Sequence, residues 1–132
     1  MERNIKTGKQ DGFTILELMI VMTIIAILVA IAIPMYQQVL VRSKETVLLD
    51  NQRAINEVID QYTADKGKMP QSVNDLVGAK YLQEVPMDPI TEQQEWEEVP
   101  GDDPNNDNER GMKDVKSKAE GTDTDGVEFS KY

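Results

Sequence analysis

Cysteine and histidine are both absent from the 132 residues of the sequence. Without cysteine there can be no disulfide, no thiol nucleophile and no thiolate metal ligand. Without histidine the chain lacks the usual general base and the commonest ligand of transition metals. Glu97 and Glu98 are adjacent carboxylates, but neighbours on a strand point to opposite faces and cannot converge on one substrate. The composition therefore argues against an enzyme.

Charged residues are absent from a long N-terminal stretch. From Leu18 to Met35 the chain has no Asp, Glu, Lys or Arg and consists mostly of Ile, Leu, Val, Met and Ala. As a helix this stretch would be about 27 Å long, close to the hydrocarbon thickness of a bilayer. A domain this small could not bury such a helix on every side. We therefore predict a membrane-spanning helix.

Positive charge is scarce in the rest of the chain. From Asp50 onward there are 20 acidic and nine basic residues, and the whole chain has a net charge of −10. A surface of this sign repels nucleic acid and anionic lipid headgroups. Nucleic acid is therefore not an expected partner.

Residues 36–66 have the periodicity of an amphipathic helix. Ile55, Val58, Ile59 and Tyr62 follow one another at i, i+3, i+4 and i+7. Neither Gly nor Pro interrupts the segment, and Gly67 directly after it is a suitable C-cap. We therefore predict one long helix. Residues 13–35 would form its membrane-spanning half and residues 36–66 its amphipathic half. Residues 1–12 are short, polar and slightly basic and would precede it as a leader peptide, which the positive-inside rule places on the cytoplasmic side.

Residues 67–132 are expected to form a small acidic head. Ser72 followed by Asp75 resembles a capping box and predicts a short helix. Apolar positions further on predict short strands at residues 96–99, 112–116 and 127–132. The stretch "GDDPNNDNERG" between the first two is expected to be an exposed loop. The predicted fold class is α+β, a long N-terminal helix with a head of one short helix and a few antiparallel strands.

The N-terminal region allows three interpretations. Ala30-Ile31-Ala32 matches the A-x-A cleavage site of a secretory signal peptide, although the apolar run is longer than such a peptide usually has. A plain single-pass anchor explains the length of the run but gives Glu17, at its edge, no role. The third interpretation accounts for the basic leader, the glycine that ends it and Glu17 together.

The segment "GFTILE", residues 12–17, resembles the class III signal of type IV pilins and their relatives, and Pro34 stands at the family's proline position. The resemblance implies that a prepilin peptidase cuts after Gly12 and methylates the new N-terminus, Phe13. The apolar run would be a membrane anchor first and a filament core later. By the same resemblance, Glu17 would neutralise the N-terminal amine of a neighbouring subunit and so fix the axial register during assembly.

The head is most similar to that of the major pseudopilin of type II secretion systems. Many type IV pilins close a C-terminal loop with a disulfide, which this chain cannot form. Met69-Pro70 stands where that family has Tyr-Pro, and a "PMDP" segment follows where it has P-x-D-P. The resemblance implies a structural subunit that polymerises through its apolar helix to drive protein export.

The same resemblance implies the partners and the location. The partners would be further copies of the chain, minor pseudopilins, the prepilin peptidase, an inner-membrane assembly platform and membrane lipid. The chain would cross the bacterial inner membrane once, with its head in the periplasm, and assemble into a periplasmic filament. Two alternatives stay open: a major or minor subunit of a type IV pilus, and a membrane-anchored or secreted acidic binding module.

The C-terminal tail allows two interpretations. Ca²⁺ prefers six to eight oxygen ligands on a flexible loop. By resemblance to the pseudopilin calcium loop, the ligands would be Ser117, Asp123 and Asp125, with Asp114 nearby, although Lys118-Ala119 replaces the usual Leu-Gly. The other interpretation is an acidic tail that keeps the head soluble. A second acidic group is expected to be a solvated loop, namely Asp102, Asp103 and Asp107.

Overall fold

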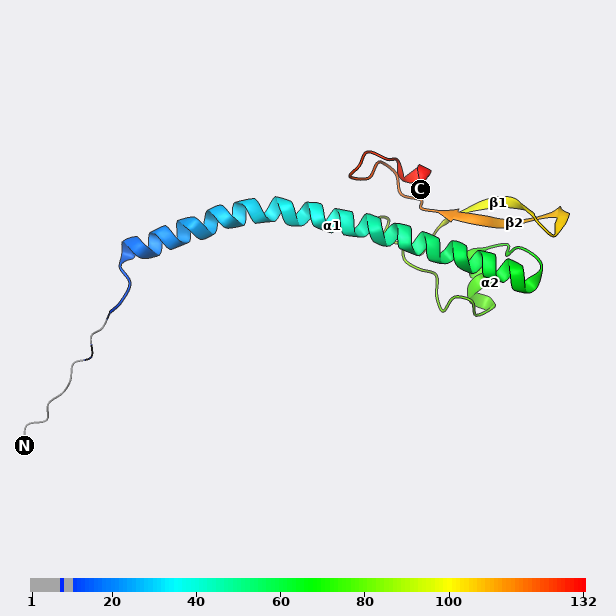
Figure 1. The fold of residues 1–132 in the computed structure, drawn as a ribbon, viewed down its shortest axis with the longest axis horizontal. Coiled ribbons are helices and arrows are strands. Elements are labelled where there is room, and N and C mark those ends of the chain that lie inside the picture. Colours follow the sequence, from blue (N-terminus) through cyan, green and yellow to red (C-terminus); the bar gives the residue numbers. More distant parts are fainter. Residues whose placement is uncertain (1–7, 9–10) are drawn as a thin grey trace, which may run out of the picture. The chain divides into compact units, whose positions relative to one another are not determined.

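The computed structural model describes Gly8 and residues 11–132, so most of the predicted leader, residues 1–7 and 9–10, lies outside the described residues. The chain divides between Gln38 and Val39 into two compact units. The elements in order are α1 (Ile15–Lys66), α2 (Val73–Gly78), β1 (Glu97–Asp103), β2 (Asn106–Lys116) and a 3₁₀ turn, η1 (Phe129–Lys131) (Figure 1). This order confirms the α+β class and the long N-terminal helix.

The second half of α1 supplies one side of the core of the C-terminal unit. Its fully buried apolar residues are Leu48, Ile55 and Ile59, while Val58 and Tyr62 are partly buried against the same core. The predicted stripe is thus confirmed. The helix ends as predicted at Gly67, which has a φ of 71° and donates its N–H to the carbonyl of Thr63 at 3.0 Å.

The other side of the core comes from α2, the hairpin and η1. The apolar side chains that close it are buried residues of these elements and their flanks: Val73, Leu76, Trp96, Met112, Val115 and Phe129. Burying each such side chain stabilises the head by roughly 1.5–3 kcal/mol. The start of α2 is capped as predicted, because Asp75 Oδ2 accepts the backbone N–H of Ser72 at 3.2 Å.

β1 and β2 form an antiparallel two-stranded hairpin, paired from Glu97 opposite Lys116 to Gly101 opposite Gly111 and beyond (Figure 1). The prediction of an exposed loop over "GDDPNNDNERG" is therefore wrong, since the strands run through most of it and turn near Pro104. Asp103 fixes the turn: Oδ1 accepts the N–H of Asn105 and Oδ2 the N–H of Met69. Cross-strand hydrogen bonds override the low strand propensity of Asp and Asn there.

The predicted strand at residues 127–132 is also wrong. Phe129 begins η1 and its ring is buried in the core. A single buried ring in a turn gives the same local pattern of apolar and polar residues as a short strand. The backbone before it is a loop in which Gly121 and Gly126 have positive φ values. Because the N–H of Phe129 donates to the carbonyl of Gly121, the loop closes on itself instead of pairing with β2.

Candidate functional site

The N-terminal half of α1 exposes its apolar side chains. Phe13 is 92% exposed, and every large apolar residue from Ile15 to Met35 is also exposed in the described structure. α1 is long and apolar enough to cross a membrane, and none of its most apolar window is buried. Because exposed apolar surface is unfavourable in water, this face requires lipid or other protein chains as its surroundings.

Glu17 and Thr14 form hydrogen bonds with each other at the start of α1. The backbone N–H of Thr14 donates to Glu17 Oε2 at 2.9 Å, and the N–H of Glu17 donates to Thr14 Oγ1 at 3.2 Å. This reciprocal pair is a capping box, which satisfies two backbone N–H groups at a helix start. Sequence reasoning gave Glu17 only an assembly role and missed Thr14. The signal was present, because T-x-x-E before an apolar run is the sequence pattern of a capping box.

Pro34 lies inside α1 and interrupts its hydrogen bonding at one place. Proline has no N–H, so the carbonyl of Ala30 loses its usual partner four residues on. The one polar side chain in the preceding turns, Thr23, is satisfied within the helix, since its hydroxyl donates to the carbonyl of Met19 at 2.7 Å. The apolar half of α1 therefore presents almost no polar side-chain atom to its surroundings.

The predicted calcium ligands are engaged in other hydrogen bonds. The Ser117 hydroxyl donates to buried Asp88 and accepts the N–H of Ala119 at 3.0 Å. Asp114 Oδ1 accepts the N–H of Val115 at 2.7 Å. In the part of the chain that the structure describes, no group of three or more acidic side chains is placed to hold a metal ion. The structure therefore does not gather the predicted aspartates into one cluster.

Asp123, the remaining ligand apart from exposed Asp125, is the centre of the C-terminal loop. Its Oδ1 accepts the N–H groups of Asp125 and Val127 at 2.9 and 2.8 Å, and its Oδ2 accepts the hydroxyl of Tyr132. The Tyr132 hydroxyl, followed by the backbone N–H groups, holds the pKa of Asp123 below its usual value. Burial and then the Asp123 carboxylate raise the pKa of Tyr132.

Glu45 is a functional candidate that sequence reasoning missed. It lies on α1 with only 7% of its surface exposed. Its Oε1 accepts the N–H of Thr124 at 2.9 Å and its Oε2 accepts the hydroxyl of Thr124 at 2.8 Å. The two residues are 79 positions apart, so no local pattern in the sequence could have indicated this pair.

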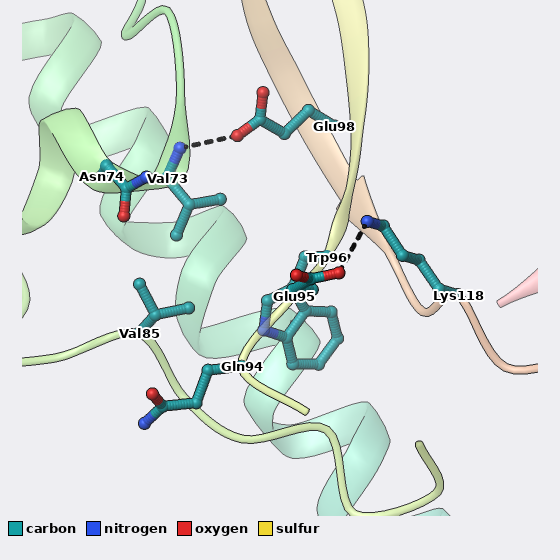
Figure 2. Close-up of a pocket in the computed structure, with 8 residues that line it drawn as sticks. All are labelled: Val73, Asn74, Val85, Gln94, Glu95, Trp96, Glu98 and Lys118. Atoms are coloured by element: carbon teal, nitrogen blue, oxygen red, sulfur yellow. Dashed lines mark hydrogen bonds and ion pairs between the residues drawn. The ribbon is translucent and has the colours of Figure 1, made fainter. Parts of the chain in front are cut away.

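A small pocket of about 150 Å³ lies between α2 and the start of β1 (Figure 2). Three of its charged side chains are paired: Glu98 Oε1 accepts the N–H of Val73 at 3.0 Å, and Lys118 Nζ lies 3.3 Å from Glu95 Oε2. Trp96 forms part of the wall and donates its indole N–H to the carbonyl of Pro86 at 2.8 Å. Trp96 is thus a core anchor, since it is also buried in the core of the head.

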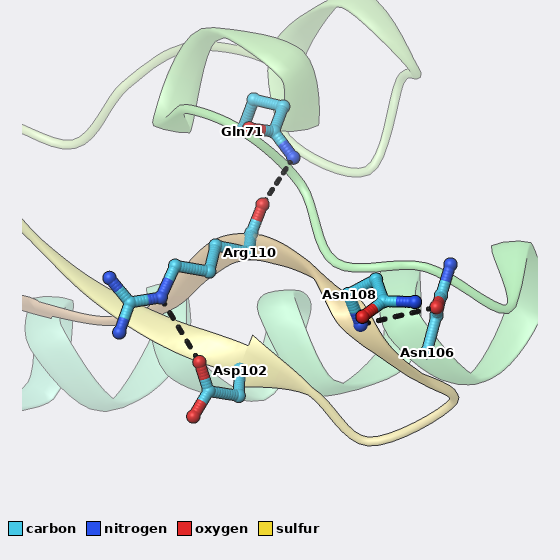
Figure 3. A network of polar contacts seen from close by, with 5 residues as sticks. All are labelled: Gln71, Asp102, Asn106, Asn108 and Arg110. Atoms are coloured by element: carbon cyan, nitrogen blue, oxygen red, sulfur yellow. Dashed lines mark hydrogen bonds and ion pairs between the residues drawn. The ribbon is translucent and has the colours of Figure 1, made fainter.

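The second acidic group belongs to the hairpin (Figure 3). Asp102 pairs with Arg110, whose carbonyl accepts the side-chain amide of Gln71 at 2.9 Å. Asp103 is 3% exposed, so the prediction of a solvated loop is wrong for this residue. Its burial is compensated by hydrogen bonds, because its carboxylate accepts the N–H groups of Met69 and Asn105.

Comparison with known proteins agrees with the N-terminal geometry. The family described as "Prokaryotic N-terminal methylation motif" matches residues 7–33. The chain is 37% identical over 81 residues to fimbrial protein EcpC of Eikenella corrodens, covering 58% of this chain and 53% of that protein. It is 36% identical over 88 residues to the type IV major pilin protein PilE1 of Neisseria gonorrhoeae, covering 58% and 51%.

A fimbrial protein of Pseudomonas aeruginosa is 51% identical over 55 residues, 42% of this chain and 32% of that protein. The chain spans about half the length, or less, of these curated relatives. No solved structure matches it significantly. The methylation motif at residues 7–33 and the pilin and fimbrial relatives together show that the chain is similar to type IV pilins.

Proposed function

We propose that this structural pilin-like subunit is a pseudopilin of a type II secretion system. The observation that carries the proposal is the methylation motif at residues 7–33, which includes the start of α1, together with the exposed apolar side chains from Ile15 to Met35. A helix of this kind needs a lipid environment before assembly and other helices after it. A subunit whose apolar helix can move from lipid into contact with other helices is suited to a filament that assembles from membrane-inserted subunits.

Processing would occur at the Gly12–Phe13 bond. α1 begins at Ile15, so this bond lies outside the helix, and both residues are exposed. Apart from its two chain neighbours, no described residue has an atom within 4 Å of the Cβ position of Gly12, which leaves room for an enzyme to approach. A prepilin peptidase would cut there and methylate the amine of Phe13.

Glu17 would then act in assembly. One of its oxygens, Oε2, is used by Thr14, while Oε1 makes no hydrogen bond to any described residue. That oxygen can accept a hydrogen bond from the N-terminal amine of a neighbouring subunit. A buried charge without a partner is strongly destabilising, so a subunit in the wrong axial register would be rejected. Pro34 and the apolar residues around it would pack in the filament core.

The head would lie in the periplasm. The subunit would cross the inner membrane once, polymerise with further copies and minor pseudopilins, and be assembled by an inner-membrane platform. The absence of cysteine and the "PMDP" segment support a pseudopilin over a pilus subunit. The second candidate is a type IV pilus subunit, which the names of the matched relatives favour.

The first experiment is the intact mass and N-terminal sequence of the protein from its native membrane. A chain beginning with N-methylated Phe13 supports the proposed processing, whereas a chain beginning at Ile33 indicates ordinary secretion. Deletion of the gene then separates the two candidates. Loss of secretion of folded proteins with normal surface pili supports the pseudopilin, and loss of surface filaments with normal secretion supports the pilus subunit.

A further inference from the structure

The C-terminal residues 121–132 fold into a loop that is fixed at three places. Phe129 is buried in the core, and its N–H donates to the carbonyl of Gly121 at 3.1 Å. Asp123 accepts two backbone N–H groups of the loop and the hydroxyl of Tyr132. The ring of Tyr132 packs edge-on against that of Phe129, with centroids 5.4 Å apart. The carboxylate of Asp123 therefore joins the start of the loop to the C-terminal aromatic residue.

Glu45 fixes the same loop to α1. Both of its oxygens accept hydrogen bonds from Thr124, the residue next to Asp123. Hydrogen bonds to a charged acceptor are stronger than those between neutral groups, and two on one residue also fix its orientation. Glu45 is buried, with 7% of its surface exposed, and both of its carboxylate oxygens are bonded to the loop.

The residues that resemble calcium ligands do not fit a calcium site in this arrangement. Ser117 uses its hydroxyl as donor to Asp88 and as acceptor from Ala119. Asp123 is held by three donors, and Asp114 by the N–H of Val115. A calcium ion needs six to eight oxygens directed at one point, whereas these oxygens face donors of their own.

We propose that Glu45, Thr124, Asp123 and Tyr132 form a metal-independent latch that closes the C-terminal loop onto α1. In this proposal the hydroxyl of Tyr132 and the backbone N–H groups supply the positive partners that a cation would supply to Asp123. Glu45 supplies the connection to the helix. The latch does not depend on whether the filament is a pseudopilus or a pilus.

The test is hydrogen exchange at single backbone amides of the full-length chain in detergent micelles, followed by NMR. The amides of Thr124 and Val127 report directly on Glu45 and Asp123. We expect both to exchange slowly in excess EDTA and equally slowly after addition of excess CaCl₂, with MgCl₂ as ionic-strength control. Glu45→Ala should speed exchange at Thr124, and Tyr132→Phe should speed it at Val127, each by about tenfold.

Asp125→Asn is the matched control, because Asp125 is a predicted calcium ligand whose side chain accepts no hydrogen bond in the latch. It should leave both amides unchanged. Protection that appears only with CaCl₂, or that is lost in Asp125→Asn, overturns the proposal, as does unchanged exchange in Tyr132→Phe. The fluorescence of Trp96 and exchange at Leu76 show whether Glu45→Ala remains folded. If it does not, Tyr132→Phe and Thr124→Val decide the question.

Discussion

Thr14 and Glu17 cap each other at the start of α1, with the two hydrogen bonds running in opposite directions. Glu17 thus has a place in the single subunit as well as its proposed place between subunits. The two roles need different chemistry. A cap needs only an acceptor atom, and glutamine serves at this position too, whereas pairing with an amine needs a negative charge.

Substitution can therefore separate the two roles. Glu17→Gln should retain the helix cap and prevent assembly, while Thr14→Ala should weaken the cap by about 1 kcal/mol and retain the charge. The measurements are hydrogen exchange at residues 15–17 in micelles and the yield of sheared or cross-linked filaments. Filaments of normal yield from Glu17→Gln would show that the charge is not needed for assembly.

Gly111 lies very close to Met69. A Cβ on Gly111 would come within 2.5 Å of Met69 Cβ and 3.0 Å of the Pro70 carbonyl oxygen. Gly111→Ala should therefore destabilise the head by about 1–3 kcal/mol, because β2 must move away from this segment. Gly78→Ala is the control, since its Cβ position is open. Urea unfolding followed by Trp96 fluorescence measures both, and equal midpoints would contradict the close packing.

Gln52 places a polar atom without a partner in the core-facing side of α1. It is 6% exposed, and its Oε1 is buried without a hydrogen bond in the part of the chain described. An unpaired buried acceptor costs about 1–3 kcal/mol. Gln52→Met, of similar length, should raise the free energy of unfolding by about 1 kcal/mol. Asn51→Leu should lower it, because Asn51 donates to the carbonyl of Met87 at 3.0 Å.

The latch should open at both ends of the pH range. The pKa of Asp123 is lowered by Tyr132 and the loop N–H groups, so its contribution is present above the ordinary pKa of 3.8 and lost as pH falls through the lower folded value. The pKa of Tyr132 is raised by burial and Asp123, with Glu45 and Asp125 adding to the effect. Its contribution is present below the ordinary value of 10.0 and lost as pH rises through the folded value.

Carbon-13 NMR titration of the Asp123 carboxyl group measures the first limit directly. In Tyr132→Phe the pKa of Asp123 should move up toward its ordinary value, since the largest cause of the shift is removed. Ser130→Ala removes a hydroxyl of the same loop that donates to Glu128 and should leave the titration unchanged. An Asp123 carboxyl that titrates identically in Tyr132→Phe and the unaltered chain would contradict the role given to Tyr132.

Features that repeat along a helix could be predicted from the sequence. The apolar run, the stripe from Ile55 to Tyr62, the Asp75 cap and the end at Gly67 each depend on neighbours within about two turns. The hairpin and the latch could not be predicted in this way. The hydrogen-bonded residues Asp103 and Met69 are 34 positions apart in the sequence, and Glu45 and Thr124 are 79 apart. Such pairs depend on how the chain returns to α1, which no local pattern encodes.

Most of the acidic side chains that fix the head act on peptide groups. Asp75, Asp88, Asp103 and Asp123 each accept backbone N–H groups close to them in sequence, whereas the described residues contain two salt bridges, both exposed. Contacts of carboxylates with neighbouring peptide dipoles are short-ranged and are weakly screened by dissolved ions. The fold of the head should therefore be stable at both low and high ionic strength, because these carboxylates stabilise it through hydrogen bonds within the fold.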